Sequence, residues 1–412
     1  MQNRNKRIAI IGAGISGLVA AKVLEEYGFS AVIYEKTDRA GGRLKTDIVE
    51  GFQMDQGFQV LLDAYPMAKK HLDFSKLKLQ KFIPGAVIYN KSYKNTLGDP
   101  IRNISLLRST LTSNIGNLSD KFKIVQLSIA LRRKSIDQIF EETETTTKAF
   151  LETYGFSEGM INLFFKPFFA GIFLEPFLET SSRMFQFVFK MFGEGSATLP
   201  IGGIAAIPDQ LLNSLSATKI QYNVSVKDLS ENKLTLDNGT EIEFDYAIIA
   251  TEPRFKNSYT NQLNWKRCDT LYFTSSNRDI SKPLIGLIAD EDALINNIFY
   301  HTSLGMDVTT EEELLSVTVV KQHNLSNAEL VEKVQQDLST YCGINNLHFL
   351  KHYAISKALP DKKNIKNKTT TQEITMNNNT FLAGDYLLNG SLNAAMASGE
   401  HAALALISAM KE

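Results

Sequence analysis

The sequence predicts an α/β fold that opens with a strand, a glycine-rich turn, a helix and a second strand. The run "RIAIIGAG" is short, apolar and rich in isoleucine, as expected for a strand buried on both faces of a parallel sheet. Gly12, Gly14 and Gly17 follow with G-x-G-x-x-G spacing. "SGLVAAKVLEEYG" has helical apolar spacing and ends at Gly28, and "SAVIYEK" adds the second strand. Together these observations indicate a Rossmann-like dinucleotide-binding unit.

Each position of this unit has a physical role in holding a dinucleotide. The first glycine permits the tight turn, the second lets the backbone approach a pyrophosphate, and the third lets the helix pack closely on the strand. The pyrophosphate is expected at the helix N-terminus, at Ile15 and Ser16, where free N–H groups and the helix dipole favour negative charge. Glu35 ends the second strand, beside Lys36, and its carboxylate can accept hydrogen bonds from a ribose. NAD and FAD enzymes share this unit, so the motif alone leaves the cofactor open.

Composition argues against several other classes of protein. The chain of 412 residues is 43% hydrophobic and 22% charged, with a formal net charge of -1, so it offers no positive field for nucleic acid. Its two cysteines lie far apart and its six histidines show no metal-ligand spacing, so we expect neither a disulfide nor a metal. The lead "MQNRNKR" lacks the apolar core of a signal peptide, and no run of about eighteen apolar residues occurs. We therefore expect a cytoplasmic protein.

The residues that follow the ribose acid favour FAD. "TDRAGGRLKT" contains Gly41, Gly42 and Arg43, and "FQMDQGFQV" supplies a D-x-G turn that ends at Gly57. In these motifs the sequence resembles the FAD-dependent amine oxidase superfamily, which includes protoporphyrinogen oxidases and phytoene desaturases. The resemblance implies that the GGR backbone and arginine lie along the pyrophosphate and the approach to the flavin ring, with Gly57 close to the cofactor.

The C-terminal segment "NTFLAGDYLLNGSLNAAMASGEHAALAL" carries a second similarity to this superfamily. It is typical of a strand, a turn at Gly384 and Asp385, and a helix that begins near Ser391. The resemblance implies that the aspartate contacts the ribityl chain or pyrophosphate, while the helix N-terminus faces the pyrimidine end of the flavin. The N-terminal residues concerned are Leu392, Asn393 and Ala394. Monoamine oxidases attach their flavin through a cysteine here, and this segment has none, so we expect non-covalent FAD.

A hairpin and a buried strand in the middle of the chain complete the expected cofactor site. "KIQYNVSVKDLSENKLTLDNGTEIEFDYAIIATEP" alternates apolar and polar residues around a turn at Asn238 and Gly239, and it closes in the strand "YAIIAT". The superfamily lays such a hairpin against adenine at the position of Val226, and its last strand passes the flavin near Ala250 and Thr251. Taken alone, a strand valine is more often core than contact.

Three separated segments therefore make up the expected FAD-binding domain, which the resemblance places in the glutathione-reductase type: residues 1–80, 196–256 and 375–412. Residues 81–195 are expected to form a helical insertion at the substrate entry, because apolar residues recur at helical spacing behind Ser and Asn caps. Residues 257–374 are expected to form a mixed β-sheet domain that binds the substrate, because runs such as "LLSVTVVKQ" alternate like strands.

The helical insertion is unusually aromatic, with Phe168 and Phe169 in the stretch "FFKPFFAGIF". Such a cluster indicates either a helical core or the lining of an apolar channel for a bulky lipophilic substrate. "PFFAGIFLEPFLETSS" and "LPIGGIAAIPDQL" are similar to stretches of protoporphyrinogen oxidases and carotene desaturases, which favours the channel and allows peripheral contact with a membrane. Gln59, Tyr300 and His301 are further residues that we expect to line the substrate cavity.

The function that the resemblance implies is FAD-dependent dehydrogenation, or desaturation, of a lipophilic substrate of isoprenoid or porphyrinogen type. Hydride passes to flavin N5, and O2, a quinone or another acceptor then takes the electrons. We name no catalytic acid or base, because the redox chemistry belongs to the cofactor. Three alternatives stay open: a redox-neutral flavin-dependent isomerase, an amine oxidase, and a lipid-binding chaperone like the Rab GDP-dissociation inhibitors. The intact glycine and acid set argues against the chaperone, which needs no FAD.

Overall fold

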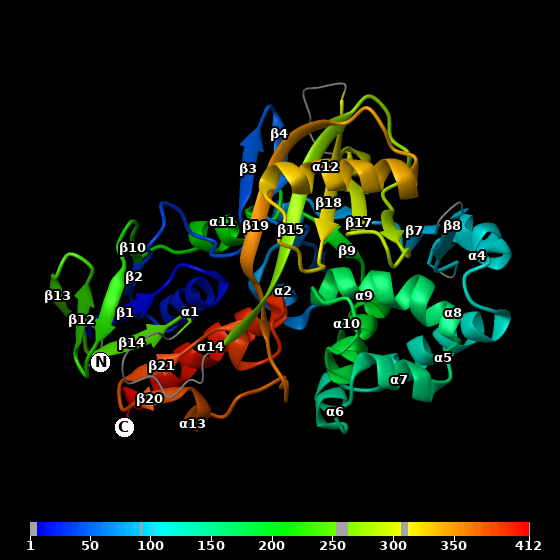
Figure 1. The fold of residues 1–412 in the computed structure, drawn as a ribbon. Coiled ribbons are helices and arrows are strands. Elements are labelled where there is room, and N and C mark those ends of the chain that lie inside the picture. Colours follow the sequence, from blue (N-terminus) through cyan, green and yellow to red (C-terminus); the bar gives the residue numbers. More distant parts are fainter. Residues whose placement is uncertain (1–5, 91–92, 101, 253–262, 306–311, 412) are drawn as a thin grey trace.

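Two large sheets and a group of helices make up the protein, a computed structural model that describes residues 6–90, 93–100, 102–252, 263–305 and 312–411 (Figure 1). The six-stranded sheet lies beside both chain ends. The seven-stranded sheet lies above it in the view of Figure 1, and the helices of the middle of the chain lie to its side.

The six-stranded sheet has the order β10-β2-β1-β14-β21-β20, and all neighbours are parallel except β20 and β21. The central strand β1 is buried throughout, because both faces of the sheet are covered. Helices α1 (Ile15–Glu26) and α14 (Leu392–Ala409) pack on one face, and a three-stranded sheet, β11-β12-β13, covers the other. The strands are β1 (Ile8–Ile11), β2 (Ala31–Tyr34), β10 (Lys219–Gln221), β11 (Val226–Leu229), β12 (Lys233–Leu236), β13 (Glu241–Glu243), β14 (Tyr246–Ile249), β20 (Thr375–Asn377) and β21 (Thr380–Leu382).

This sheet draws its strands from three distant parts of the chain, residues 8–34, 219–249 and 375–382. Each part falls within one of the three segments that we assigned to the FAD-binding domain. The division into domains stays our interpretation, and its boundary between residues 256 and 257 lies outside the described residues.

The seven-stranded sheet has the order β19-β15-β18-β17-β16-β7-β8 and is antiparallel except where β16 meets β7. Its two long strands, β15 and β19, run from this sheet down toward α14 and so connect the two sheets (Figure 1). The strands are β7 (Gly85–Asn90), β8 (Tyr93–Gly98), β15 (Asn264–Ser275), β16 (Ile285–Ile288), β17 (Ile295–Tyr300), β18 (Glu313–Val319) and β19 (His348–Asp361).

The first part of the expected helical insertion is not helical. Within residues 81–195, strands β7 and β8 form a hairpin at the edge of the seven-stranded sheet. The run "AVIY" in β7 is buried on both faces and pairs in parallel with β16. This strand therefore depends on hydrogen bonds to a partner that is distant in the sequence. The segment 81–195, which we expected to be a helical insertion, therefore opens with a strand hairpin at residues 85–98.

From residue 104 onward the insertion is helical, as the spacing predicted. Helix α10 packs against α5, α6 and α7, and the fully buried rings of Phe165, Phe169, Phe185 and Phe187 form the centre of this group. The helices are α4 (Leu107–Thr112), α5 (Leu118–Arg133), α6 (Ile136–Glu141), α7 (Thr147–Tyr154), α8 (Glu158–Met160), α9 (Lys166–Phe173) and α10 (Ser182–Glu194).

Shorter elements join these regions. The strand pair β3-β4 follows the first βαβ unit, and β9 pairs with both β5 and β6. The strands are β3 (Thr46–Val49), β4 (Phe52–Asp55), β5 (Leu61–Leu62), β6 (Gln80–Lys81) and β9 (Ala197–Leu199). The helices are α2 (Pro66–His71), α3 (Phe74–Leu77), α11 (Ala206–Asn213), α12 (Asn327–Asp337) and α13 (Thr371–Ile374). Single turns are η1 (Ile104–Leu106), η2 (Ile161–Phe165), η3 (His301–Leu304), η4 (Leu338–Cys342) and η5 (Asp385–Leu387).

Candidate functional site

One cavity of about 2800 Å³ runs between the two sheets and the helical group, and residues of all three regions line it. It begins at the carboxyl ends of β1, β2 and β14, where open α/β sheets bind their ligands. Its volume exceeds the roughly 300–1,000 Å³ of an ordinary ligand pocket. The cavity is therefore large enough for a dinucleotide and a second molecule.

The first glycine motif shapes the near end of the cavity through backbone clearance. Gly12 has φ +101°, and a Cβ there would lie 2.5 Å from Thr251 Cγ2. A Cβ on Gly17 would lie 2.1 Å from the carbonyl oxygen of Gly12, so the third glycine lets α1 pack directly on the turn. Gly14 is the N-cap of α1, and no described side chain caps this helix end. The first N–H groups of α1 are therefore left for a ligand.

The GGR turn lies directly against this motif. Gly41 bridges Gly14, and the Gly41 N–H donates to the carbonyl of Ala13 at 2.9 Å. Gly42 has φ +62°, and a Cβ there would lie 3.2 Å from Gly14 Cα. We call Gly12, Gly14, Gly41 and Gly42 the glycine cradle, because side chains at these positions would fill the space that the two turns enclose.

Glu35 lies at the edge of the glycine cradle and is only 6% exposed. Its carboxylate accepts hydrogen bonds from the N–H of Ala13 at 2.8 Å and from the N–H and hydroxyl of Thr37 at 2.9 and 2.8 Å. Two carboxylate oxygens can accept about four hydrogen bonds, so acceptor capacity remains for a ribose hydroxyl. Glu35 thus fits the role that the sequence predicted for it.

The C-terminal GD turn closes the opposite side of the cradle. Gly384 has φ +156°, and its N–H donates to the Ser398 hydroxyl at 2.9 Å. Asp385 is 4% exposed and accepts a charge-assisted hydrogen bond from the Arg43 guanidinium at 2.6 Å. This pair joins the two motifs that resembled the superfamily, although 342 residues separate them in the chain.

The helix after the GD turn begins where the sequence predicted. Ser391 caps α14, and its hydroxyl accepts from the N–H of Ala394 at 3.0 Å. A Cβ on Gly399 would lie 2.2 Å from the carbonyl oxygen of Ser16, and the Ser16 hydroxyl donates to the carbonyl of Ala395 at 2.8 Å. Small residues therefore let α14 pack backbone to backbone on α1, which brings both helix N-termini to one cavity.

These features fit a bound dinucleotide. The cradle leaves room only for backbone, the α1 N-terminus offers uncapped donors for phosphate, and the buried Glu35 offers an acceptor for ribose. The residues that would hold the cofactor come from β1, β2, β14, the GGR turn and the GD turn.

Most of the predicted site residues line this one cavity. Those predicted for the cofactor are Gly12, Gly14, Ile15, Ser16, Glu35, Lys36, Gly41, Gly42, Arg43, Gly57, Val226, Ala250, Thr251, Gly384, Asp385 and Leu392, and those predicted for the substrate are Gln59, Phe168 and Phe169. Gly17, Asn393 and Ala394 lie outside the lining, because the first packs on the turn and the other two are buried at the start of α14.

Tyr300 and His301 do not line the cavity, and this part of the prediction was wrong. Tyr300 belongs to the apolar core on the other face of the seven-stranded sheet, between that sheet and α12. His301 follows the end of β17, and its Nε2 lies 2.9 Å from the Ser316 hydroxyl. Complete burial lowers the pKa of His301 to about 4, so the imidazole stays neutral within the core. Strand alternation could not reveal this, because it does not say which face of the sheet meets the cavity.

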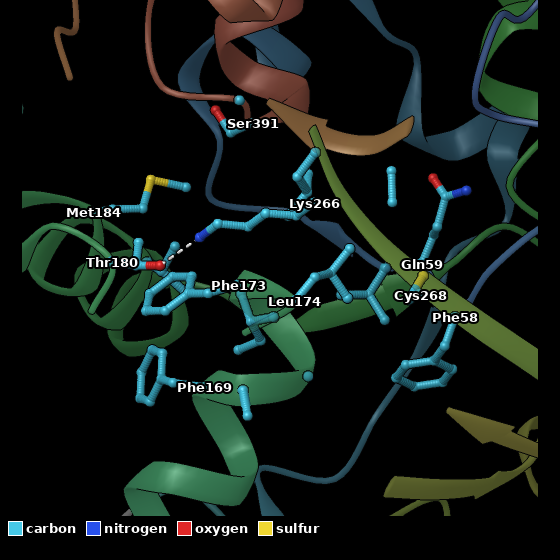
Figure 2. Close-up of a pocket in the computed structure, with 18 of the residues that line it drawn as sticks. Phe58, Gln59, Phe169, Phe173, Leu174, Thr180, Met184, Lys266, Cys268 and Ser391 are labelled. Carbon is cyan, nitrogen blue, oxygen red and sulfur yellow. Dashed lines mark hydrogen bonds between the residues drawn. The ribbon is translucent and has the colours of Figure 1, made fainter. Parts of the chain in front are cut away.

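The far end of the cavity is apolar. Phe169, Phe173 and Leu174 come from α9 and its end, Met184 comes from α10, and Phe58 faces them from the opposite wall (Figure 2). We call these five residues the phenylalanine chamber. The rings of Phe169 and Phe173 thus line the cavity and also belong to the helical core.

Two polar side chains stand at the chamber. The Lys266 ammonium reaches across it and donates to the Thr180 hydroxyl at 2.8 Å (Figure 2). Burial lowers the pKa of Lys266 despite the nearby carboxylates of Glu175, Asp361 and Glu179. Burial raises the pKa of the Cys268 thiol to about 12, so this cysteine is a neutral thiol and not a nucleophile.

Sequence reasoning missed a polar cluster beside the cradle. Trp265, Glu252 and Lys357 line the cavity close to Arg43, and they come from β15, the end of β14 and β19. The single tryptophan of the chain was the available signal, since tryptophan is rare and serves at contacts that need both an apolar face and an N–H donor. Its partners could not be found, because the sequence does not show which strands become neighbours.

Among the residues that the structure describes, no group of three or more His, Cys, Asp or Glu side chains could hold a metal ion. None of the helices in the same ranges has the length and hydropathy that crossing a bilayer requires.

Comparison with known proteins identifies the family. Residues 15–271, more than half of the chain, match the model of the flavin-containing amine oxidoreductases. The chain belongs to this family. Its relatives include protoporphyrinogen oxidase 2 of Arabidopsis thaliana, 26% identical over 40% of this chain and 32% of that one. They also include the L-amino-acid oxidase BmooLAAO-I of Bothrops moojeni, 27% identical over 60% and 53% of the two chains. The matches thus span a third to about half of these relatives.

Solved structures agree with this assignment at the level of the fold. The CLA-producing fatty acid isomerase from P. acnes has a TM-score of 0.71 and 14% identity, and the match covers 97% of this chain and 98% of that one. The predicted fold class is confirmed. The family also confirms the flavin cofactor and the assignment to flavin-dependent oxidoreductases. Neither cysteine lies in the C-terminal segment, in line with non-covalent FAD.

Proposed function

We propose that the protein dehydrogenates a lipophilic, isoprenoid- or porphyrinogen-like substrate with bound FAD. One observation carries this proposal: a single cavity connects the glycine cradle with the phenylalanine chamber. When bound, the flavin supplies the redox chemistry by accepting hydride at N5. The chain's own residues hold the cofactor at the cradle and surround the substrate with apolar side chains that exclude water.

The chamber favours a lipophilic substrate over a small amine. Its walls are the rings and aliphatic chains of the phenylalanine chamber, and such a lining suits an apolar substrate. Lys266 reaches into the chamber near the carboxylates of Glu175, Glu179 and Asp361, so an ammonium group would meet both a cation and anions there. The apolar lining makes the amine oxidase alternative less favoured, and it remains an outcome of the experiment below.

Anaerobic incubation of the FAD-loaded protein tests the proposal. Protoporphyrinogen and phytoene are the probes, with putrescine as the amine control. Loss of the oxidised flavin band with one of the first two supports dehydrogenation, and its return with O2 or a quinone identifies the electron acceptor. Product without any loss of the band means isomerisation. Bleaching of the flavin by putrescine alone, or no response to any probe, overturns the proposed substrate class. A colourless protein that does not bind added FAD points to the lipid-binding chaperone.

We also propose that the cavity opens toward an anionic lipid surface beside α4 and α5. Leu118, Phe122, Val125 and Ile129 form one stripe along α5, and Leu118 and Phe122 are 72% and 63% exposed. Val125 and Ile129 also line the cavity, together with Leu111 of α4. An exposed apolar stripe of this kind marks an interaction site.

Charge around this stripe favours anionic lipid. Residues 102–134 contain seven Lys or Arg and one acid, and that acid, Asp120, is buried at the start of α5. The rest of the chain is therefore acidic, because the whole chain has a formal net charge of only -1. Basic residues near a membrane surface add about 1 kcal/mol each at physiological salt.

Sedimentation with lipid vesicles tests the contact. We expect binding to vesicles that contain phosphatidylglycerol, weaker binding to phosphatidylcholine alone, and loss of binding in the double variant Leu118→Ser, Phe122→Ser. Ile48→Ser, which changes an exposed isoleucine on β3, is the matched control. Equal binding by both variants would overturn the assignment to this surface.

A further inference from the structure

Trp265 stands where the two sheets meet. It lies at the start of β15, opposite Pro360 of β19, and it lines the cavity at the cradle end. It is the only tryptophan in the chain. Neither the sequence motifs nor the family match assigns it a role.

Two cations lie against its ring. The Arg43 guanidinium carbon is 5.3 Å from the ring centroid, and the Lys357 ammonium is 5.4 Å from it. Both distances are within the roughly 6 Å over which a cation is attracted to an indole face. Both cations therefore contact the same indole ring on this wall of the cavity.

Hydrogen bonds fix the indole in this place. Its Nε1–H donates to Glu252 Oε1 at 3.2 Å, and the other oxygen of Glu252 pairs with Lys357. Arg43 in turn pairs with Asp385 and donates to the carbonyl of Ala358 at 3.0 Å. The cluster therefore joins the GGR turn, the end of β14, the GD turn and both long strands.

Arg43 of this cluster adjoins a site built for negative charge. Gly41 and Gly42 of the glycine cradle directly precede Arg43, and the α1 N-terminus presents uncapped N–H groups beside the cradle. Backbone donors recognise a pyrophosphate by shape, but they leave most of its two negative charges without a counter-charge. Arg43 and Lys357 both line this cavity. Each is paired with one carboxylate, Asp385 or Glu252, and keeps further N–H donors for a phosphate.

We propose that Trp265 is a cofactor-positioning residue: its indole holds the Arg43 guanidinium and the Lys357 ammonium over the glycine cradle, where they complete the binding site for the FAD diphosphate. The inference rests on the flavin of the family and is independent of the proposed substrate. Because Trp265 belongs to β15, the cofactor then also fastens the seven-stranded sheet to the six-stranded one.

Titration of the apoprotein with FAD tests the proposal. We expect Trp265→Leu to weaken FAD binding roughly tenfold, because an aliphatic side chain of moderate size keeps the apolar contact and loses attraction to both cations. Trp265→Phe restores most of the affinity, because it returns an aromatic face without the N–H group. An unchanged affinity in Trp265→Leu, or equal losses in the two variants, would overturn the proposal.

Thermal unfolding with and without FAD separates positioning from a structural role. A positioning residue lowers the rise in Tm that FAD produces and leaves the Tm of the apoprotein nearly unchanged. A merely structural fastening lowers the Tm of the apoprotein and leaves the rise intact, which contradicts the proposal. Should Trp265→Leu fail to fold, Lys357→Met with Trp265 intact tests the role of the cations. We expect the FAD affinity of this variant to fall and the salt dependence of FAD binding to weaken. An unchanged affinity and salt dependence would contradict the proposed role of the cations in binding the diphosphate.

Discussion

The glycine cradle and the phenylalanine chamber lie in one cavity, yet they hold together in different ways. In the cradle, backbone meets backbone: a Cβ on Gly42 would lie 3.2 Å from Gly14 Cα. In the chamber, ring meets ring: the centroids of Phe169 and Phe173 are 5.2 Å apart, and Phe169 also lies 4.8 Å from Phe185 of the helical core. The cradle therefore demands one residue type at each position, whereas the chamber demands only apolar volume.

The chamber should show the largest loss of stability on truncation. Phe169 is 1% exposed and contacts Phe165, Phe168, Phe173 and Phe185. Phe169→Ala leaves a cavity, so we expect the free energy of unfolding to fall by about 4 kcal/mol. Urea unfolding of the apoprotein measures this. Phe169→Leu keeps most of the volume and should lose less than about half as much. An equal loss in both variants would mean that ring geometry, and not volume, holds the chamber.

The turn that carries the cradle should lose stability through backbone collision and not through lost volume. Gly17 packs behind the cradle, and Gly17→Ala forces a methyl group against the carbonyl of Gly12. We expect the free energy of unfolding to fall by about 3 kcal/mol even without FAD, measured by the same urea titration.

Gly14→Ala is the matched control. Gly14 has φ -75°, and the nearest atom to its added Cβ is Gly42 Cα at 4.0 Å, so the apoprotein should lose less than about 0.5 kcal/mol. The new methyl group points into the cradle, however, and FAD affinity should fall at least roughly tenfold. Intact FAD binding in Gly14→Ala would break the comparison, because the cradle would then not be the cofactor site.

Asp55 should make the free energy of unfolding depend on pH, which tests a buried polar contact against the backbone contacts of the cradle and the ring contacts of the chamber. It lies at the end of β4, where its carboxylate accepts from the Thr46 hydroxyl at 2.6 Å and from the Ile204 N–H at 3.0 Å. Burial outweighs these bonds and raises its pKa to about 6 from an ordinary value of 3.8. A raised carboxyl pKa stabilises the protonated folded state, so Asp55 stabilises the protein most below pH 4 and loses this contribution as the pH rises to 6.

Unfolding of wild type and Asp55→Asn at pH 4, 5, 6 and 7 measures this contribution. Asparagine keeps an acceptor for both donors but does not titrate. We expect the stability of wild type relative to the variant to decline by about 2–3 kcal/mol between pH 4 and 6 and then to level off. A difference that stays constant over this range contradicts the prediction.

Glu35 should give the smallest effect on FAD affinity. Glu35→Gln keeps one acceptor oxygen and turns an amide NH2 group toward the donors on the other side, so FAD affinity should fall roughly tenfold and the apoprotein should lose some stability as well. Fluorescence titration with FAD measures the loss. Glu26→Gln, at the exposed end of α1, should leave the affinity unchanged. A similar loss in both variants would show that net charge, and not the ribose contact, is responsible.

Local sequence was most informative where all residues of a site lie close together in the chain. Gly12, Gly14, Gly17 and Glu35 lie within one βαβ unit, and short-range spacing sets their geometry, so their places could be predicted. Tyr300 and His301 show the opposite case, because the face that a strand presents depends on what packs against it. The β7-β8 hairpin was missed for a related reason: its partner β16 lies almost 200 residues away.

The sequence by itself determined the dinucleotide-binding unit, the two turns that suit FAD, and the presence of a phenylalanine-rich helical region. These features depend on residue type and local spacing. Only the tertiary structure decided that Arg43 pairs with Asp385, that Arg43 and Lys357 both contact Trp265, and that cradle and chamber share one cavity. Such contacts join strands and turns that are distant in the chain, and the sequence contains no local signal for which of them become neighbours.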